Sequence, residues 1–372
     1  MNIIFLLLNV FFFATNSFQT NLFKIVNKEY IKENIIISPL SAYQVLGLAA
    51  NSADGETLDE MIKVLENVNI EEVNDINGEI ARERKKFSSI EIANAVMPKQ
   101  EPKKAFFILA ILYEDTVEKL ENVAQVNNWC NNKTHGNLRT ILGSYDSKTV
   151  MLLLNAIYFK GIWKIKFDEK KAKSEIFYNL EKGKIKEKEV EFMGVESKFL
   201  YYKDKTTQII ELPYEKDNMS AIIVLPNEEI NINDYISNLT DDKLPKLINN
   251  METKKIQLEL PKFKIHFSTN LAPALIKMGM NIPFSKGADF SKLVDNAKDI
   301  YINDIIQNIF LSVDEKGSED AAITDSKIIE KNVSMLVNRP FLFMLRNKKY
   351  PKNYQILFMA KIEKIDSTFD FE

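Results

Sequence analysis

LPKFKIHFSTNLAPALIKMGMNIPFSKGADFS, residues 260–291, begins inside a run that is typical of β-strands. That run, IQLELPKFKIHF at 256–267, is rich in β-branched and aromatic residues, as buried and half-buried strands are. Similar runs precede and follow it, at 150–161, 207–215, 219–226, 308–315, 334–346 and 354–362. We therefore expect extensive β-sheet in the second half of the chain.

Helices are expected mainly in the first half. Apolar residues recur at helical spacing over 18–27, 39–50, 55–65 and 123–134. The chain has no internal repeat and no Pro-rich or Gly/Ser-rich linker that would mark a domain boundary. A single domain can reach 372 residues when helices cover a large sheet. We predict one mixed α/β (α+β) domain over residues 18–372, without predicting its strand order.

The composition gives little support to an enzyme or to a nucleic-acid-binding protein. Lys plus Arg total 49 and Asp plus Glu total 52, so no global field would attract nucleic acid. Cys130, His135 and His266 are the only cysteine and histidines, which leaves little material for a metal site or a histidine-based catalytic centre. Cys130 and His135 are the one such pair close in sequence, and they lie in WCNNKTHGN, where Gly136 marks the end of a helix.

The N-terminus carries an apolar run from Ile3 to Ala14, which is shorter than the roughly 20 residues that a membrane-spanning helix needs. Its length suits a secretory signal peptide over residues 1–17, with Thr15 and Ser17 at the two small positions before a cleavage site at Phe18. The alternative is a first helix packed on the body of the protein. We expect an extracellular protein, with the cytoplasm as the alternative. Asn-x-Ser/Thr sequons stand at Asn132, Asn218, Asn238 and Asn332.

The charged stretch EKGKIKEKEVE, residues 181–191, alternates in sign. Such alternation favours a solvated turn or an edge strand over a basic ligand patch. We assign this stretch no function.

Four blocks of the chain resemble the serpin family. They are NIIISPLSAYQVLGLAANSADGETLDEMIKVL at 34–65, LNAIYFKGIWKIKFD at 154–168, ELPYEKDNMSAIIVLP at 211–226 and the opening stretch at 260–291. In addition, SVDEKGSEDAAIT at 312–324 is similar to the hinge of the family's reactive loop, and NRPFLFMLRNKKYPKNYQILFMAKI at 338–362 is similar to its C-terminal strands.

This resemblance implies three β-sheets covered by eight or nine helices, and an exposed reactive-centre loop at about 317–337. It also implies a serine-protease inhibitor that acts as a suicide substrate. The target enzyme attacks one loop bond and forms an acyl-enzyme, and the freed loop then enters the largest sheet as a new strand. A shutter segment holds that sheet closed before cleavage, and the matching positions are Ser38, Ser41, Asn155 and Gln307. Gln307 stands where the family usually has histidine, so this position cannot titrate.

The expected hinge must be flexible, and its side chains must be small enough to enter a packed sheet. It comprises Gly317, Ser318, Glu319, Asp320, Ala321, Ala322, Ile323 and Thr324. Because strand side chains alternate, Ser318, Asp320, Ala322, Thr324 and Ser326 would face the core, and Glu319, Ala321, Ile323, Asp325 and Lys327 would face solvent. Asp320 replaces the alanine usual in inhibitory serpins, and burying its carboxylate costs several kcal/mol.

The family's usual spacing from Gly317 places the attacked bond between Lys331 and Asn332, which suits a trypsin-like protease. The segment from Gly317 to Pro340 is shorter than in most serpins. Ile329, Met335 and Leu336 are therefore alternatives for the bait residue, which precedes the attacked bond, and they would suit a chymotrypsin-like or elastase-like enzyme. A glycan on Asn332 would obstruct docking at the favoured bond.

An alternative function remains open. A non-inhibitory serpin with a carrier, storage or chaperone role, or a plain protease substrate, is favoured by Asp320 and the short loop. We expect a monomer with no cofactor, no nucleic-acid partner and no membrane span. Lys103 and Lys104 are the only neighbouring basic residues in 101–120, so we expect no strong polyanion activator such as heparin.

Overall fold

The computed structural model describes residues 17–181, 184–240, 242–316 and 333–366. The described residues form nine α-helices: α1 (Phe18–Glu29), α2 (Pro39–Ala50), α3 (Gly55–Val64), α4 (Ile70–Arg84), α5 (Lys104–Tyr113), α6 (Val123–Lys133), α7 (Ile232–Ser237), α8 (Lys243–Asn249) and α9 (Ala272–Lys277). Short 3-10 turns cover Ile282–Phe284 and Lys352–Tyr354.

The strands of the described residues are β1 (Ile35–Ile37), β2 (Ile90–Pro98), β3 (Thr116–Val117), β4 (Met151–Phe159), β5 (Asp168–Glu181), β6 (Lys184–Lys203), β7 (Thr207–Pro213), β8 (Met219–Pro226), β9 (Glu252–Pro261), β10 (Phe263–Asn270), β11 (Asp304–Val313), β12 (Val333–Leu336), β13 (Phe341–Asn347) and β14 (Ile356–Ile362).

Side-chain caps explain where several helices begin. Ser38 caps α2 by accepting a hydrogen bond from the backbone N–H of Ser41 at 3.2 Å, and Pro39 occupies the first helical position. Asn69 and Asn122 cap α4 and α6 in the same way, each accepting from a backbone N–H three residues later at 2.9 Å. The predicted helix at 39–50 therefore has the observed bounds, and those at 18–27, 55–65 and 123–134 differ from α1, α3 and α6 only at their C-terminal ends.

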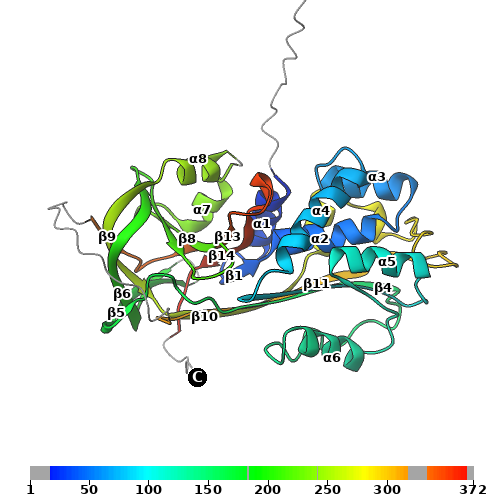
Figure 1. Ribbon diagram of the computed structural model, residues 1–372, viewed down its shortest axis with the longest axis horizontal. Helices are drawn as coiled ribbons and strands as arrows, with labels where there is room; N and C mark the ends of the chain where they lie inside the picture. The colour runs from blue at the N-terminus through cyan, green and yellow to red at the C-terminus, as the bar shows by residue number, and fades with distance from the viewer. Residues whose placement is uncertain (1–16, 182–183, 241, 317–332, 367–372) are drawn as a thin grey trace, which may run out of the picture.

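One sheet has five strands in the order β10-β11-β4-β2-β3. The pairs β10–β11 and β4–β2 are antiparallel, whereas β11–β4 and β2–β3 are parallel. Helices α2, α4 and α5 lie over one face of this sheet and α6 lies over the other (Figure 1). A small apolar cluster that includes Trp129 and Cys130 joins α6 to the sheet, and the main core fills the opposite side.

The remaining strands form a nine-stranded array in which β6 is shared. Strand β6 pairs first with β5, then with β9, and finally with β7, which leads on to β8, β13, β14 and β1. Divided at β6, this array gives two sheets, and the five-stranded sheet is the third. The predicted α+β class is thus confirmed, and the nine helices of the described residues agree with the eight or nine that were expected.

Two predicted strand runs each divide into two strands. The run at 256–267 is broken after Pro261, so β9 and β10 belong to different sheets. The run at 334–346 is broken around Pro340 into β12 and β13. Proline lacks the N–H that a sheet ladder requires, which explains both breaks. The described residues of the charged stretch, 181 and 184–191, lie in β5 and β6. Among the described strands β5 pairs only with β6, as an edge strand does.

Across the described segments, no helix has both the length and the apolar character that crossing a bilayer demands.

Candidate functional site

The site is built around the parallel seam between β4 and β11. Eight residue pairs align across it, from Leu152 opposite Asp304 to Phe159 opposite Leu311. The segment 317–332 follows β11 and lies outside the described residues. The chain is described again from Val333, where β12 pairs with β9 in the nine-stranded array. The undescribed segment therefore connects the centre of one sheet to a strand of another.

Three carboxamides form a row across the middle of the seam. Gln307 on β11 lies opposite Asn155 on β4, and Asn155 lies opposite Asn94 on β2. Gln307 Nε2 donates to Asn155 Oδ1 at 2.7 Å, and Asn155 Nδ2 donates in turn to Asn94 Oδ1. All three side chains are buried, so each of these hydrogen bonds satisfies a group that water cannot reach.

The N-terminus of α2 holds this amide row from one side. Gln307 accepts from the backbone N–H of Ser38 at 2.8 Å and donates to the Ser38 carbonyl at 3.0 Å. Ser41 Oγ donates to Asn94 Oδ1 at 2.9 Å and accepts from Asn155 Nδ2. The structure therefore brings together all four predicted shutter residues, Ser38, Ser41, Asn155 and Gln307. It adds Asn94, which the sequence analysis did not identify.

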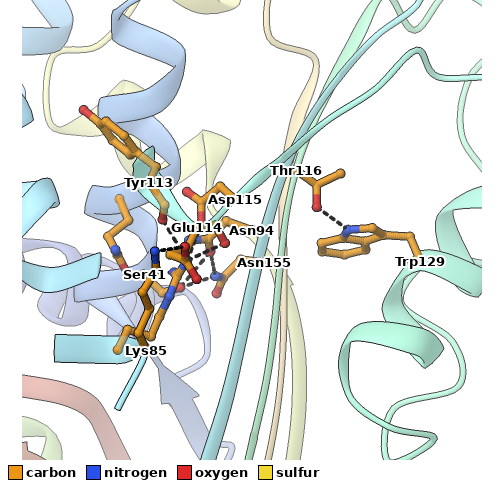
Figure 2. A network of polar contacts seen from close by, with 11 residues as sticks. Ser41, Lys85, Asn94, Tyr113, Glu114, Asp115, Thr116, Trp129 and Asn155 are labelled. Atoms are coloured by element: carbon orange, nitrogen blue, oxygen red, sulfur yellow. Dashed lines mark hydrogen bonds and ion pairs between the residues drawn. The ribbon is translucent and has the colours of Figure 1, made fainter. Parts of the chain in front are cut away.

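Beyond Asn94 the polar chain continues to a buried ion pair (Figure 2). Asn94 Nδ2 donates to Asp115 Oδ1 at 2.9 Å, and Arg84 Nη2 lies 2.9 Å from the same oxygen. Burial raises the pKa of the Asp115 carboxyl, an effect that Arg84 and Asn94 oppose. One signal in the sequence could have revealed Asn94, because it is a polar residue at an otherwise apolar position of IEIANAVMP.

An aromatic cluster closes the end of the seam nearest the undescribed loop. The Trp163 indole N–H donates to the carbonyl of Asp314 at 2.8 Å, and its ring stacks on Tyr214 with centroids 4.3 Å apart. Gly161 is required here, since a Cβ at this position would lie 2.4 Å from the Tyr214 ring. The cluster thus fixes the end of β11 at the point where the chain leaves the sheet.

Two of the alternative residues for the attacked bond lie in the described part of the chain. Met335 is fully buried, and both Met335 and Leu336 are paired with β9 in β12, so the observed geometry favours neither as a residue presented to a protease. The bounds of the reactive-centre loop, about 317–337, stay a prediction. The hinge residues 317–324, Ile329, Lys331 and Asn332 lie outside the described residues, so those assignments stay predictions.

The remaining predicted positions lie away from the seam. The sequon residues Asn132, Asn218 and Asn238 are exposed on the surface, and glycosylation at them stays a prediction. Cys130 is buried, which raises its thiol pKa to about 12, whereas exposed His135 pairs with Glu91 at 2.7 Å. A thiol with so high a pKa is protonated at neutral pH, so this pair does not support an enzyme.

Comparison with known proteins gives a consistent result. Residues 13–365 match the sequence model of the family described as Serpin (serine protease inhibitor). Iripin-8 of Ixodes ricinus is 28% identical over 89% of this chain and 88% of its own length. Intracellular coagulation inhibitor 2 of Tachypleus tridentatus is 32% identical over 64% of this chain, a match that spans 59% of that relative. The solved structure of tengpin, a thermophilic serpin in the native state, superposes with a TM-score of 0.84 at 30% identity, covering 98% of this chain and 96% of tengpin.

Proposed function

The chain belongs to the serpin family, whose members are generally protease inhibitors, and on that premise we propose that it inhibits a serine endopeptidase as a suicide substrate. The protease serine attacks the carbonyl carbon of Lys331, the bond to the nitrogen of Asn332 breaks, and the new N-terminus of the C-terminal fragment takes up a proton. The ester that joins Lys331 to the protease then persists if the loop enters the sheet before water hydrolyses it.

The parallel pairing of β4 with β11 is the observation that carries this proposal. A strand that entered between them and ran opposite to both would replace one parallel ladder with two antiparallel ladders. Antiparallel pairing is slightly more stable per residue, and the added strand gains hydrogen bonds at about 0.5–1.5 kcal/mol each. Because only residues 314–316 separate the end of β11 from residues 317–332, a reversal of the chain there would give the loop the required direction.

We favour a trypsin-like target because Lys331 would fit a specificity pocket that holds a carboxylate.

We also propose that the protein is secreted after cleavage before Phe18. Such cleavage removes Ser17, the N-cap of α1, whose Oγ accepts from the Thr20 backbone N–H at 3.4 Å. The new ammonium group at Phe18 would then lie at the positive end of the α1 dipole, so the first turn of α1 should loosen.

A mixing experiment tests the proposed inhibition. The intact chain is incubated with trypsin, chymotrypsin and elastase, and the products are separated on a denaturing gel. A complex of inhibitor plus protease that survives denaturation supports the proposal, and mass spectrometry of the released C-terminal fragment identifies the attacked bond. Complete cleavage without a complex for every protease would show that the chain is a substrate.

The second candidate, a non-inhibitory serpin, rests on Asp320. If the Asp320 carboxylate, which insertion would bury, only slows insertion, Asp320→Ala should shift the outcome from cleaved product toward complex. The matched control is Glu319→Ala, which lies on the predicted solvent face and should leave the partition unchanged. A chain that forms no complex even with Asp320→Ala would favour the carrier, storage or chaperone role.

A further inference from the structure

The hydrogen bonds from each member of the amide row to the next run in one direction. Ser38 N–H donates to Gln307, Gln307 donates to Asn155, Asn155 donates to Asn94, and Asn94 donates to Asp115. Each amide thus accepts from the preceding member of the row and donates to the following one. The row extends from the N-terminus of α2, across the seam, to the beginning of β3.

The two ends of the row fix this direction. At one end, a backbone N–H can only donate, and the Ser38 carbonyl, which can only accept, also receives Gln307 Nε2. At the other end, an ionised carboxylate can only accept. If every amide were reversed, an NH2 group would face the Ser38 N–H and an amide oxygen would face Asp115. Both contacts would leave buried groups unsatisfied.

We infer that Asp115 is a positioning residue that keeps the β4–β11 seam closed by orienting Asn94. Arg84 holds the Asp115 carboxylate from α4, and it also donates to the Tyr113 carbonyl at 2.8 Å. With its NH2 group directed to Asp115, Asn94 presents its oxygen to both Asn155 and Ser41. Asp115 therefore acts on the seam through Asn94 and touches neither β4 nor β11 in the amide row. The consequence for inhibition rests on the proposed function, whereas the effect on the seam does not.

The residues beside Asp115 connect it to the helices on both faces of the sheet (Figure 2). Glu114 pairs with Lys85 at the end of α4 at 2.7 Å, and Thr116 Oγ1 accepts from the Trp129 indole N–H of α6 at 3.1 Å. The segment 113–116 thus joins α4 and α6 to the amide row. This placement explains how a carboxylate outside the seam can influence its closure.

Hydrogen exchange followed by mass spectrometry tests the inference on the intact protein without any protease. In Asp115→Ala, exchange in peptides from β4 and β11 should rise at least about tenfold relative to peptides from β13 and β14. The matched control is Glu363→Ala, which removes a buried carboxylate that pairs with buried Lys361 at 3.2 Å. The control should raise exchange near β14 and leave the exchange rate of peptides from β4 and β11 themselves unchanged.

A double variant keeps the test decisive even if Asp115→Ala fails to fold. In Asn94→Asp combined with Asp115→Asn, the carboxylate at 94 accepts from Asn155, Ser41 and the new amide. The bonds from Ser38 to position 94 therefore keep their direction, and only the bond between positions 94 and 115 is reversed. The single variant Asn94→Asp instead places two carboxylates together. Slow seam exchange in the double variant and fast exchange in Asn94→Asp support the inference. Equal exchange in both, or a uniform rise across the molecule in Asp115→Ala, would overturn it.

This result is separable from the proposed function. If the wild-type chain forms no covalent complex, the proposed inhibitory function is refuted, whereas the exchange pattern still tests the positioning role of Asp115. If the complex forms but seam exchange does not depend on Asp115, only the positioning role fails.

Discussion

Asn155 is the residue on which the closed seam depends most directly. It is fully buried at the centre of the amide row and contacts Gln307, Asn94 and Ser41. Gln307 also bonds the backbone of Ser38 at the N-terminus of α2, and Ser41 also donates to Asn94 on β2. Separation of β4 from β11 would therefore break the row between Gln307 and Asn155 and leave the rest of it in place.

Replacing Asn155 by Ala should destabilise the protein by about 2 kcal/mol, because buried donors and acceptors lose their partner. It should also speed the spontaneous loss of the loop-exposed form during incubation at a temperature below unfolding. Urea unfolding measures the first effect, and native gels over time measure the second. Asn179→Ala is the control, since Asn179 is equally buried but binds Ile365 far from the seam. If both variants convert at the same rate, the row has no special role in closure.

The titration of Asp115 gives a pH dependence with a definite sign. Burial raises its pKa above the ordinary 3.8, against the lowering effect of Arg84, while nearby Glu114 adds to the rise. A raised folded-state pKa contributes stability that is present below 3.8 and is lost as pH rises through the folded-state pKa.

Wild type should therefore gain stability relative to Asp115→Asn, which cannot titrate, as the pH falls from 7 toward 4. Urea unfolding of both proteins across this range measures the difference in the free energy of unfolding. The raised pKa of Asp115 would be contradicted if wild type did not gain free energy of unfolding relative to Asp115→Asn as the pH falls, or if it lost some.

Among the elements, helices α2 and α4 pack unusually closely. A Cβ at Gly47 of α2 would lie 2.3 Å from Asn77 Nδ2 and 2.9 Å from Val73 Cγ1 of α4. Gly47→Ala should separate the two helices and destabilise the protein by about 1–3 kcal/mol, the usual cost of overpacking.

Gly78→Ala supplies the control, since it lies inside α4 with no atom within 4 Å of the added Cβ. It should stabilise the protein by up to about 1 kcal/mol through helix propensity. Thermal melting of both variants checks the opposite signs, and a shift in the same direction for both would show that the close contact does not matter.

The same elements show what the sequence can and cannot predict. Helix α2 was predicted with its correct bounds from apolar residues at helical spacing, and in the structure the Ser38 cap and Pro39 mark its start. Helix α5, KAFFILAILY, was not predicted, because apolar residues occupy all its sides and Ile108, Ile111 and Leu112 are exposed. Helical periodicity disappears from such a sequence.

The candidate site was predicted only in the part that the family resemblance supplied. Asn94, Asn155 and Gln307 are far apart in the chain, and only the register of β2, β4 and β11 aligns them. Asp115 and Arg84 join the site through contacts with no local sequence pattern. Pairing between distant strands depends on the whole fold, so neither the row nor its direction could be derived from periodicity.

For the whole molecule, the proposed mechanism requires the five-stranded sheet to accept one more strand between β4 and β11. The described residues give the five-stranded sheet its parallel seam, and the loop that would fill it joins β11 to β12. On the proposed mechanism, cleavage within 317–332 would release the loop from its attachment at β12, and the loop would then enter the seam and add a full set of hydrogen bonds and buried contacts. Cleaved protein should therefore unfold at a much higher temperature than intact protein, with a rise of well over about 10 °C expected from several kcal/mol of added stability.

Two neighbouring substitutions make this prediction specific. Thr324 lies on the predicted core face of the inserted loop, and Ile323 lies on the solvent face. Thr324→Arg should block insertion, because a charged side chain would have to enter the core, so the cleaved variant should melt close to the intact protein. Ile323→Arg should leave the rise in melting temperature nearly unchanged. Calorimetry of intact and nicked samples of both variants measures the effect. If cleaved wild type melts at the same temperature as the intact protein, the loop does not enter the sheet. If both cleaved variants keep the rise in melting temperature, the side chains of the inserted loop do not alternate between core and solvent as proposed.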